Sequence, residues 1–205
     1  RAYIKLSARS RPELVLCPPF PYLAEMAKGE GRKAKGHGSI ALGAQSVFWE
    51  GAGAYTGEVT AEMLKDLGVT HVIIGHSERR ALGDTDAIIA EKLTRAIAHE
   101  LTPILCVGES ERDSEGRYLS IIREELTLAL APLTAKERAR IIVAYEPLWA
   151  IGKDASSAIR PDDLAEMVLY IRKVLSDLLP GKSSSRSIIL YGGSVEPENA
   201  GGLVQ

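Results

Sequence analysis

Short apolar runs recur along the chain, and each is followed by a turn and then by a longer segment with helical spacing of its apolar residues. This order is typical of parallel strands that are joined by helices. The runs are almost continuously apolar, which indicates strands that are buried on both faces. Six runs have this character, at residues 14–17, 40–44, 71–75, 103–107, 141–145 and 188–191.

Between the runs, apolar residues that repeat every four positions predict helices that cover the sheet. Two such stripes are Ile89, Leu93 and Ile97, and Ile122, Leu126 and Leu130. Thr134 precedes Glu137 by three residues, which predicts a capping box at a helix start. Pro161 is followed by two Asp residues and opens a third apolar stripe, as the first turn of a helix prefers.

The breaks between these units are short clusters of Gly, Pro and Ser, so we expect residues 1–205 to form a single domain. Six βα units fit either an open, doubly wound sheet or most of a (β/α)8 barrel, and periodicity does not separate the two. A dinucleotide-binding sheet carries Gly-x-Gly-x-x-Gly after its first strand. The nearest match, at residues 51–57, is one residue too long, so a Gly-rich loop shaped by packing explains it better.

The chain has 205 residues, with 25 Lys and Arg against 27 Asp and Glu, so its net charge of −2 gives no strong field for nucleic acid or an anionic membrane. Its 45% hydrophobic and 25% charged residues are typical of a globular protein. Cys17 and Cys106 lie in apolar runs, which favours structural thiols in a reducing, cytoplasmic setting. No apolar stretch approaches the roughly 18 residues of a membrane span. The chain begins without Met, and we expect sequence to be missing at both ends.

Polar residues follow four of the predicted strands, at the end where a barrel builds its active site. They are His76, Glu109, Glu146 and the turn Gly192-Gly193-Ser194. A lone His or Glu is more often structural, but repetition at equivalent positions favours a site. His76 and Glu146 suit the electrophile and base of a proton transfer next to a carbonyl. The Gly-Gly-Ser turn suits either a phosphate or a tight turn, and residues 147–158 suit either a lid or an ordinary loop.

Five segments stand in the same order as in one enzyme family: GAQSVFWEGAGAYTGE, IIGHSERR, ILCVGE, AYEPLWAIG and YGGSV. Through them the chain resembles triosephosphate isomerase from Pro12 to Val204. The resemblance implies a (β/α)8 TIM barrel, of which the sequence covers about six βα units. It also implies an isomerase of glycolysis and gluconeogenesis that interconverts dihydroxyacetone phosphate and glyceraldehyde 3-phosphate through an enediolate, with no cofactor and no metal.

The resemblance also implies roles for particular residues. Glu146 is similar to the family's catalytic base and His76 to its neutral electrophile, an established pair in this family. Glu78 is similar to the acidic residue of the Ser-Glu-Arg turn that supports the site. Gly152 and Ser194 resemble ligands of the substrate phosphate, and Gly193 belongs to the same Gly-Gly-Ser turn as Ser194.

The segment around Gln45 and Tyr55-Thr56 resembles the family loop that reaches into a neighbouring subunit, which implies a homodimer. Two features depart from the family. Lys153-Asp154-Ala155 stands where the lid usually has Thr-Gly-Lys, which makes Lys153 a candidate substitute cation. The family's first strand, with its Asn and Lys, and its last strand, with a Gly-Gly phosphate loop, are not in the sequence. We therefore expect these 205 residues alone to isomerise poorly.

Two alternatives stay open at this point. One is a non-catalytic, oligomeric remnant of the family, which the absent Lys and Gly-Gly loop favour. The other is a barrel glycosidase that uses Glu109 and Glu146, which a carboxyl separation of about 5–5.5 Å or 6.5–9.5 Å would support. The sequence shows no aromatic platform for a sugar beside these two residues, which favours the isomerase.

Overall fold

The computed structural model describes residues 14–28, 40–152, 159–179 and 187–203. Within them, the strands form one six-stranded sheet whose order follows the chain. Each strand lies inside the apolar run that predicts it, except that the fourth begins one residue earlier. The strands are β1 (Val15–Leu16), β2 (Ala41–Ala44), β3 (His71–Ile74), β4 (Thr102–Val107), β5 (Ile142–Tyr145) and β6 (Ile189–Tyr191).

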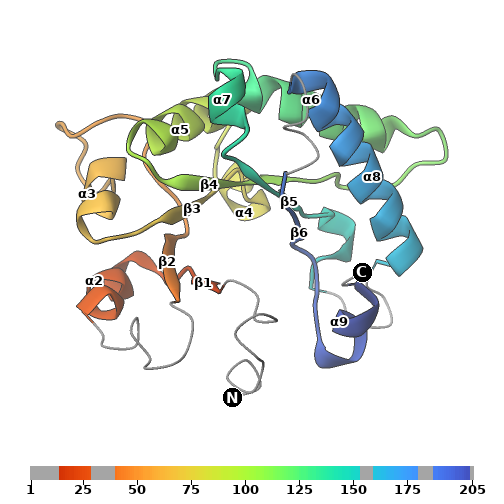
Figure 1. Cartoon of the computed structure of the whole chain (residues 1–205), viewed down its shortest axis with the longest axis horizontal. Coiled ribbons are helices and arrows are strands. Elements are labelled where there is room, and N and C mark those ends of the chain that lie inside the picture. The colour runs from red at the N-terminus through yellow and green to blue at the C-terminus, as the bar shows by residue number, and fades with distance from the viewer. Residues whose placement is uncertain (1–13, 29–39, 153–158, 180–186, 204–205) are drawn as a thin grey trace.

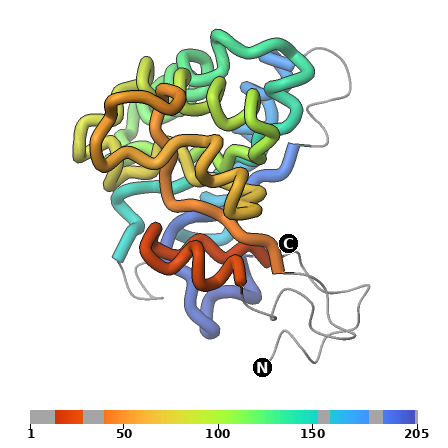
Figure 2. Tube along the Cα trace, turned by 90° about the vertical axis from the view of Figure 1, so that its left-hand side faces the viewer, coloured from red at the N-terminus to blue at the C-terminus, as the bar shows by residue number. Residues whose placement is uncertain are grey.

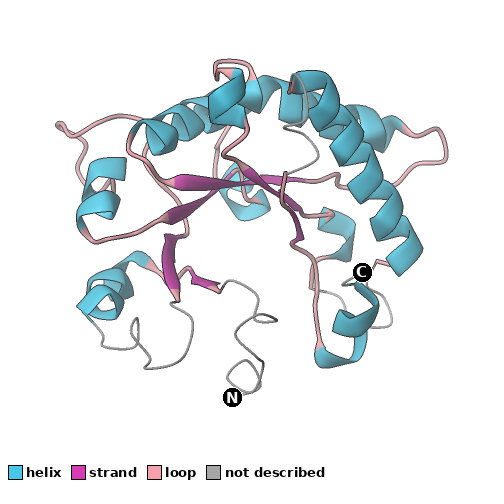
Figure 3. Ribbon diagram, in the orientation of Figure 1, coloured by secondary structure: helices cyan, strands magenta, loops and turns pink. Residues whose placement is uncertain are grey.

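The strand order separates the two architectures that the sequence leaves open. A doubly wound sheet reverses its order at a switch point, whereas here each strand pairs in parallel with the one before it in the chain. The sheet curls, with its strands as an inner layer and helices arched around the outside (Figures 1 and 3). The fold is a partial TIM barrel, as the sequence predicts.

Helices lie between the strands (Figure 1). They are α2 (Phe20–Lys28), α3 (Ala61–Asp66), α4 (Ser77–Ala81), α5 (Asp86–Ala98), α6 (Arg117–Leu130), α7 (Ala135–Arg138), the 3₁₀ helix η2 (Leu148–Ala150), α8 (Pro161–Leu178) and α9 (Pro197–Leu203). Turned by 90°, the trace shows α2 and α9 below the main body of helices, at the two ends of the curl (Figure 2). The three longest helices of the described residues, α5, α6 and α8, arch over the outer face of the sheet (Figure 1).

The strand side chains alternate between two layers, as a pleated strand requires. On the outer side, Val72, Leu105 and Tyr145 are fully buried and join the helices in one large apolar cluster. On the inner side, a smaller cluster fills the concave face, with Ile104 and Cys106 as members. Burial on both faces explains why the runs are nearly continuous in apolar residues.

The predicted helix signals are confirmed. All three residues of each stripe are buried, on α5 and on α6. The capping box is present, because the Thr134 hydroxyl accepts the Glu137 N–H while the Glu137 carboxylate accepts the Thr134 N–H at 2.8 Å. Helix α8 begins at Pro161 with Asp162 and Asp163 in its first turn. Local signals were sufficient here because caps and stripes depend on residues close in sequence.

Both cysteines are free thiols, as expected from their apolar surroundings. In the part of the chain that the structure describes, helices are too short or too polar to cross a membrane.

Candidate active site

His76 and Glu146 come from strands that are not neighbours, β3 and β5, yet their side chains meet at the carboxyl end of the sheet. The His76 Nε2 atom lies 2.9 Å from Glu146 Oε1. The Glu146 side chain is only 7% exposed, and that of His76 is 32% exposed. The pair thus combines a carboxylate shielded from water with an imidazole that a small molecule can reach.

The orientation of His76 follows from its place at the start of α4. Its Nδ1 atom accepts the Glu78 N–H at 3.2 Å, so the side chain caps the helix. A ring nitrogen that accepts a hydrogen bond carries no proton, which leaves the proton of the neutral ring on Nε2. Nε2–H therefore donates to Glu146, and the same N–H is available to a substrate carbonyl that displaces the carboxylate.

Glu146 is fixed through both its side chain and its backbone. Its second oxygen, Oε2, accepts the Ser77 N–H at 3.0 Å. Its backbone N–H donates to Val107 O at 2.8 Å, which ties the end of β5 to the end of β4. Gly108 follows Val107, and a Cβ atom there would fall on the backbone carbonyl of Glu146. Only glycine permits this close approach of the two strand ends.

The charge of Glu146 reaches the concave face of the sheet. Burial, and to a smaller extent the negative charge of Glu146, raise the pKa of the Cys106 thiol to about 12. Cys106 is therefore a neutral packing residue at physiological pH, in line with its predicted structural role.

The structure places Glu78 differently from its neighbours in the Ser-Glu-Arg turn. Its side chain is 87% exposed, and its nearest carboxylate oxygen is 4.0 Å from His76 Nδ1. The backbone N–H of Glu78, not its carboxylate, is what holds His76. Sequence gave no means of telling these two contributions apart.

Gly152, Gly193 and Ser194 lie farther out, around the end of β6 and the segment after β5. The Ser194 hydroxyl donates to Ala150 O at 3.2 Å, two residues before Gly152. Gly152 is exposed and has a φ of +67°, a conformation that favours glycine. Gly192, next to Gly193, lies against the Glu146 side chain, since a Cβ there would be 3.5 Å from Glu146 Cβ. Residues 153–158, with Lys153, lie outside the described residues.

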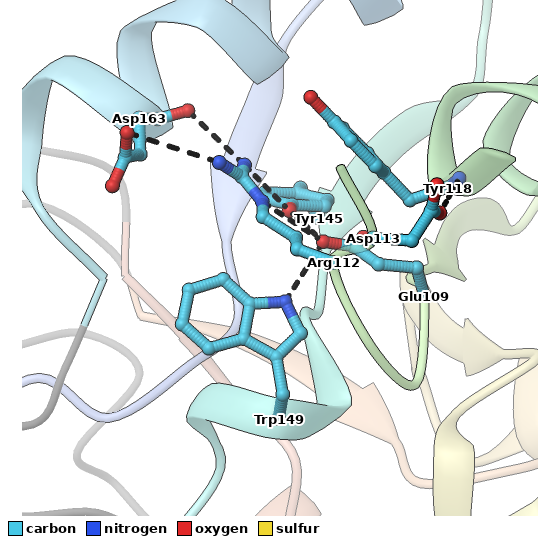
Figure 4. A network of polar contacts seen from close by, with 7 residues as sticks. All are labelled: Glu109, Arg112, Asp113, Tyr118, Tyr145, Trp149 and Asp163. Atoms are coloured by element: carbon cyan, nitrogen blue, oxygen red, sulfur yellow. Dashed lines mark hydrogen bonds and ion pairs between the residues drawn. The ribbon is translucent and has the colours of Figure 1, made fainter. Parts of the chain in front are cut away.

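Glu109 belongs to a closed network beside the site (Figure 4). It is fully buried, and its Oε1 accepts the Tyr145 hydroxyl at 2.7 Å and the Trp149 Nε1–H at 2.9 Å. Arg112 lies 3.4 Å from the same oxygen and also contacts the Asp163 carbonyl on α8. This network joins the loop after β4 to η2 and α8. A carboxylate so enclosed is unsuited to the acid or base role of a glycosidase.

The loop that contains Gln45, Tyr55 and Thr56 has anchored ends and an open tip. Gln45 donates to Cys17 O at 3.1 Å, and Phe48 N–H donates to Val59 O at 2.9 Å. Residues 52–58 are all exposed, and the Tyr55 ring packs against Phe48 at a tilt of 56°, with ring centroids 4.8 Å apart. The tip is thus held in place while presenting its surface outward.

Two groups that hold Glu146, the Ser77 N–H and Gly108, were not predicted from the sequence. The Ser77 N–H was hidden because a backbone donor leaves no signal in residue type. Gly108 lies at a predicted strand end, but its contact with Glu146 depends on how closely β4 and β5 approach.

No group of three His, Cys, Asp or Glu side chains that suits a metal ion occurs among the described residues. The arrangement instead offers a shielded carboxylate, an N–H donor and nearby glycines.

Comparison with known proteins gives a consistent result. A family model described as triosephosphate isomerase matches residues 2–205. The triosephosphate isomerase of Moorella thermoacetica is 43% identical over 203 residues, which cover 97% of this chain and 78% of that protein. That of Caldanaerobacter subterraneus subsp. tengcongensis is 41% identical, with 98% and 79% covered. That of a Roseiflexus species is 44% identical, with 94% and 74% covered.

Proposed function

The chain belongs to the triosephosphate isomerase family, and from that premise we propose that it interconverts dihydroxyacetone phosphate and glyceraldehyde 3-phosphate through Glu146 and His76. The observation that carries this proposal is the 2.9 Å contact between His76 Nε2 and Glu146 Oε1. It brings a base and a hydrogen-bond donor to one point at the carboxyl end of the sheet.

In the proposed reaction, Glu146 removes a proton from the carbon next to the substrate carbonyl. The electron pair of that C–H bond forms the carbon–carbon double bond of an enediolate, and the carbonyl oxygen takes the negative charge. His76 Nε2–H donates to this oxygen, where a hydrogen bond strengthens as the charge develops. The hydroxyl proton on the first carbon's oxygen then moves to the former carbonyl oxygen, and Glu146 returns its proton to the second carbon. The carbonyl thereby forms on the first carbon and the hydroxyl on the second, so the net reaction neither gains nor loses atoms.

Gly152, Gly193 and Ser194 are proposed to hold the substrate phosphate. Their support is position, since Ser194 contacts Ala150 and Gly192 lies against Glu146. Backbone N–H groups beside glycines can approach phosphate oxygens closely. In this proposal the phosphate lies on the β6 side of the catalytic pair, and the carbonyl end of the substrate extends toward His76.

The decisive experiment replaces Glu146 by Asp in the purified protein, assayed with each triose phosphate by coupled spectrophotometry. The shorter side chain retracts the carboxylate by roughly an ångström, which costs about 100-fold in rate when positions matter. We expect kcat to fall by that order while KM changes little. Glu109→Asp is not a suitable comparison because Glu109 is buried in its own network, so the exposed Glu111→Asp serves as the control.

A Glu146→Asp protein with unchanged kcat would reject Glu146 as the base. A folded parent protein that neither isomerises nor binds triose phosphate would favour the non-catalytic alternative.

We also propose a homodimer, a single domain for residues 1–205 and a cytoplasmic location. The dimer is supported by the exposed, anchored tip at residues 52–58, and the single domain by the large apolar cluster that runs from Leu23 on α2 to Leu179 after α8. The free thiols favour a reducing compartment.

Sedimentation of Thr56→Asp tests the dimer, because a charge buried without a partner weakens an interface. Ser120→Asp, on exposed α6 surface, is the control and is expected to sediment as the parent does.

A further inference from the structure

The two halves of the catalytic pair lie on different strands, so something must fix the distance between the ends of β3 and β5. His76 follows Gly75 at the end of β3, and Glu146 packs its backbone against Gly108 at the end of β4. The spacing of Gly75 and Gly108 therefore sets the spacing of the pair. Two charged side chains, Arg80 and Glu125, join these glycines.

Arg80 holds the His76 side of the connection. Its Nε–H donates to Gly75 O at 3.1 Å, immediately before His76. Its NH1 group donates to Asp86 at 2.7 Å, at the start of α5. Its NH2 group lies 3.4 Å from Glu125 Oε1, an ion pair without an aligned hydrogen bond. The guanidinium is planar and charged, so its two directed hydrogen bonds orient it and turn its third nitrogen toward the Glu125 carboxylate.

Glu125 holds the Glu146 side. Its Oε2 accepts the Gly108 N–H at 2.9 Å, across the join between β4 and α6. Its side chain is 13% exposed, and burial raises its pKa despite the nearby Arg80. Burial removes water from the Glu125 carboxylate, which is unfavourable unless protein groups replace that water. The Gly108 N–H and Arg80 are the groups that do so.

We propose that Arg80 and Glu125 are positioning residues that hold His76 and Glu146 at their reactive distance. The chain of contacts runs from Gly75 through Arg80 and Glu125 to Gly108, whose Cα lies against the Glu146 backbone. Neither residue touches the His76 or Glu146 side chain in a described hydrogen bond or ion pair. The inference rests on the proposed function, in which that pair transfers the proton.

The experiment compares Glu125→Ala, Glu125→Gln and the neighbouring exposed Glu124→Ala in the full chain. Alanine removes both contacts of Glu125, so we expect kcat to fall about 10- to 100-fold, as for a misplacement of roughly an ångström, with KM within about twofold. Glutamine keeps an oxygen for the Gly108 N–H but loses the ion pair with Arg80, so it is expected to recover only part of the loss. Glu124→Ala is expected to match the parent. Arg80→Lys, which keeps the charge but not the two directed hydrogen bonds to Gly75 O and Asp86, is a second variant if Glu125→Ala does not fold.

A second readout does not depend on turnover. The His76 Nε2–H proton, held by Glu146, is expected to give a protected, downfield signal in ¹⁵N-edited NMR, and this signal should be lost or shifted in Glu125→Ala and Arg80→Lys. Folded variants that keep both the parental signal and the parental kcat would overturn the positioning role. A different outcome would overturn the proposed function alone. In that outcome the parent protein shows the expected His76 signal, but Glu146→Asp leaves kcat unchanged.

Discussion

The central strands β3, β4 and β5 are longer and more buried than the outer strands β1 and β6, although all of them come from similar apolar runs in the sequence. The central strands have four, six and four residues, and most of their side chains are buried. β1 and β6 have two and three residues, none of them buried. His76 and Glu146 follow central strands, whereas Gly193 and Ser194 follow β6.

This contrast separates a densely buried centre of the sheet from less buried edges. The proposed proton transfer depends on positions within about an ångström, and its residues lie where packing and hydrogen bonds converge from several strands. Recognition of a phosphate by backbone N–H groups tolerates adjustment, and its proposed residues lie on the less buried side. Stability and precision thus coincide at the centre of the sheet. The variants below compare a central position with an outer one of the same residue type.

The largest effect is expected from truncating a central apolar side chain. Leu105 on β4 is fully buried, whereas Leu190 on β6 is 42% exposed. Leu105→Ala should lower the free energy of unfolding by about 2–5 kcal/mol, since it removes buried methyl groups and leaves a cavity. Leu190→Ala should lower it by less than about 1 kcal/mol. Urea unfolding of both variants measures the contrast, and equal losses would show that the outer strand is packed as firmly as the centre.

The next comparison uses two glycines. A Cβ at Gly108 would fall on the Glu146 backbone, whereas at Gly201 in α9 it would meet nothing within 4 Å. Gly108→Ala should cost about 1–3 kcal/mol of stability through overpacking, and it should lower kcat as well because Glu146 moves. Gly201→Ala should be neutral or stabilise by up to about 1 kcal/mol, because alanine favours a helix. Thermal unfolding and the coupled assay together check this, and a harmless Gly108→Ala would remove the contact from the account of the site.

The architecture was predictable only in part from residue order, and the glycines show why. Alternation of apolar runs and stripes predicts strands and helices because both depend on neighbours within a few residues. Whether the sheet curls or opens depends on strand order, which periodicity does not encode. His76 and Glu146 were recognisable as candidates from their place after strands, but the Gly108 contact and the Arg80–Glu125 pair required the distance between strand ends. The exposed carboxylate of Glu78 shows the same limit, since helix geometry turned its side chain to solvent.

A smaller contrast is expected between the two thiols. Cys106 on β4 is buried with a pKa of about 12, while Cys17 beyond β1 is partly exposed and has a pKa raised by burial. At pH 8 a thiol with that pKa has about one thiolate in 10⁴ molecules, and the thiolate is the reactive species. A disulfide reagent such as Ellman's should therefore modify Cys17 first in the folded protein and both cysteines rapidly in guanidinium. Labelling of Cys106 at the rate of Cys17 would contradict the rigidity of the centre.

The smallest effect concerns two glutamates whose pKa values shift in opposite directions. Burial raises the pKa of Glu125 in the centre, whereas hydrogen bonds from the Thr134 hydroxyl and N–H lower the pKa of Glu137 at the periphery. The unfolded chain releases both protons near pH 4.3. The contribution of Glu125 to stability is therefore greatest below that pH and is lost as pH rises through its folded pKa. The contribution of Glu137 to stability is present above about pH 4.3 and is lost as pH falls through its folded pKa.

Replacing either glutamate by Gln removes the pH dependence of stability that this glutamate causes. The stability of the parent minus that of the variant should therefore fall with rising pH for Glu125→Gln and rise with pH for Glu137→Gln. Urea unfolding from pH 3.5 to pH 7 measures both slopes, and slopes of the same sign would mean that Glu125 is more hydrated than its packing against Gly108 and Arg80 implies.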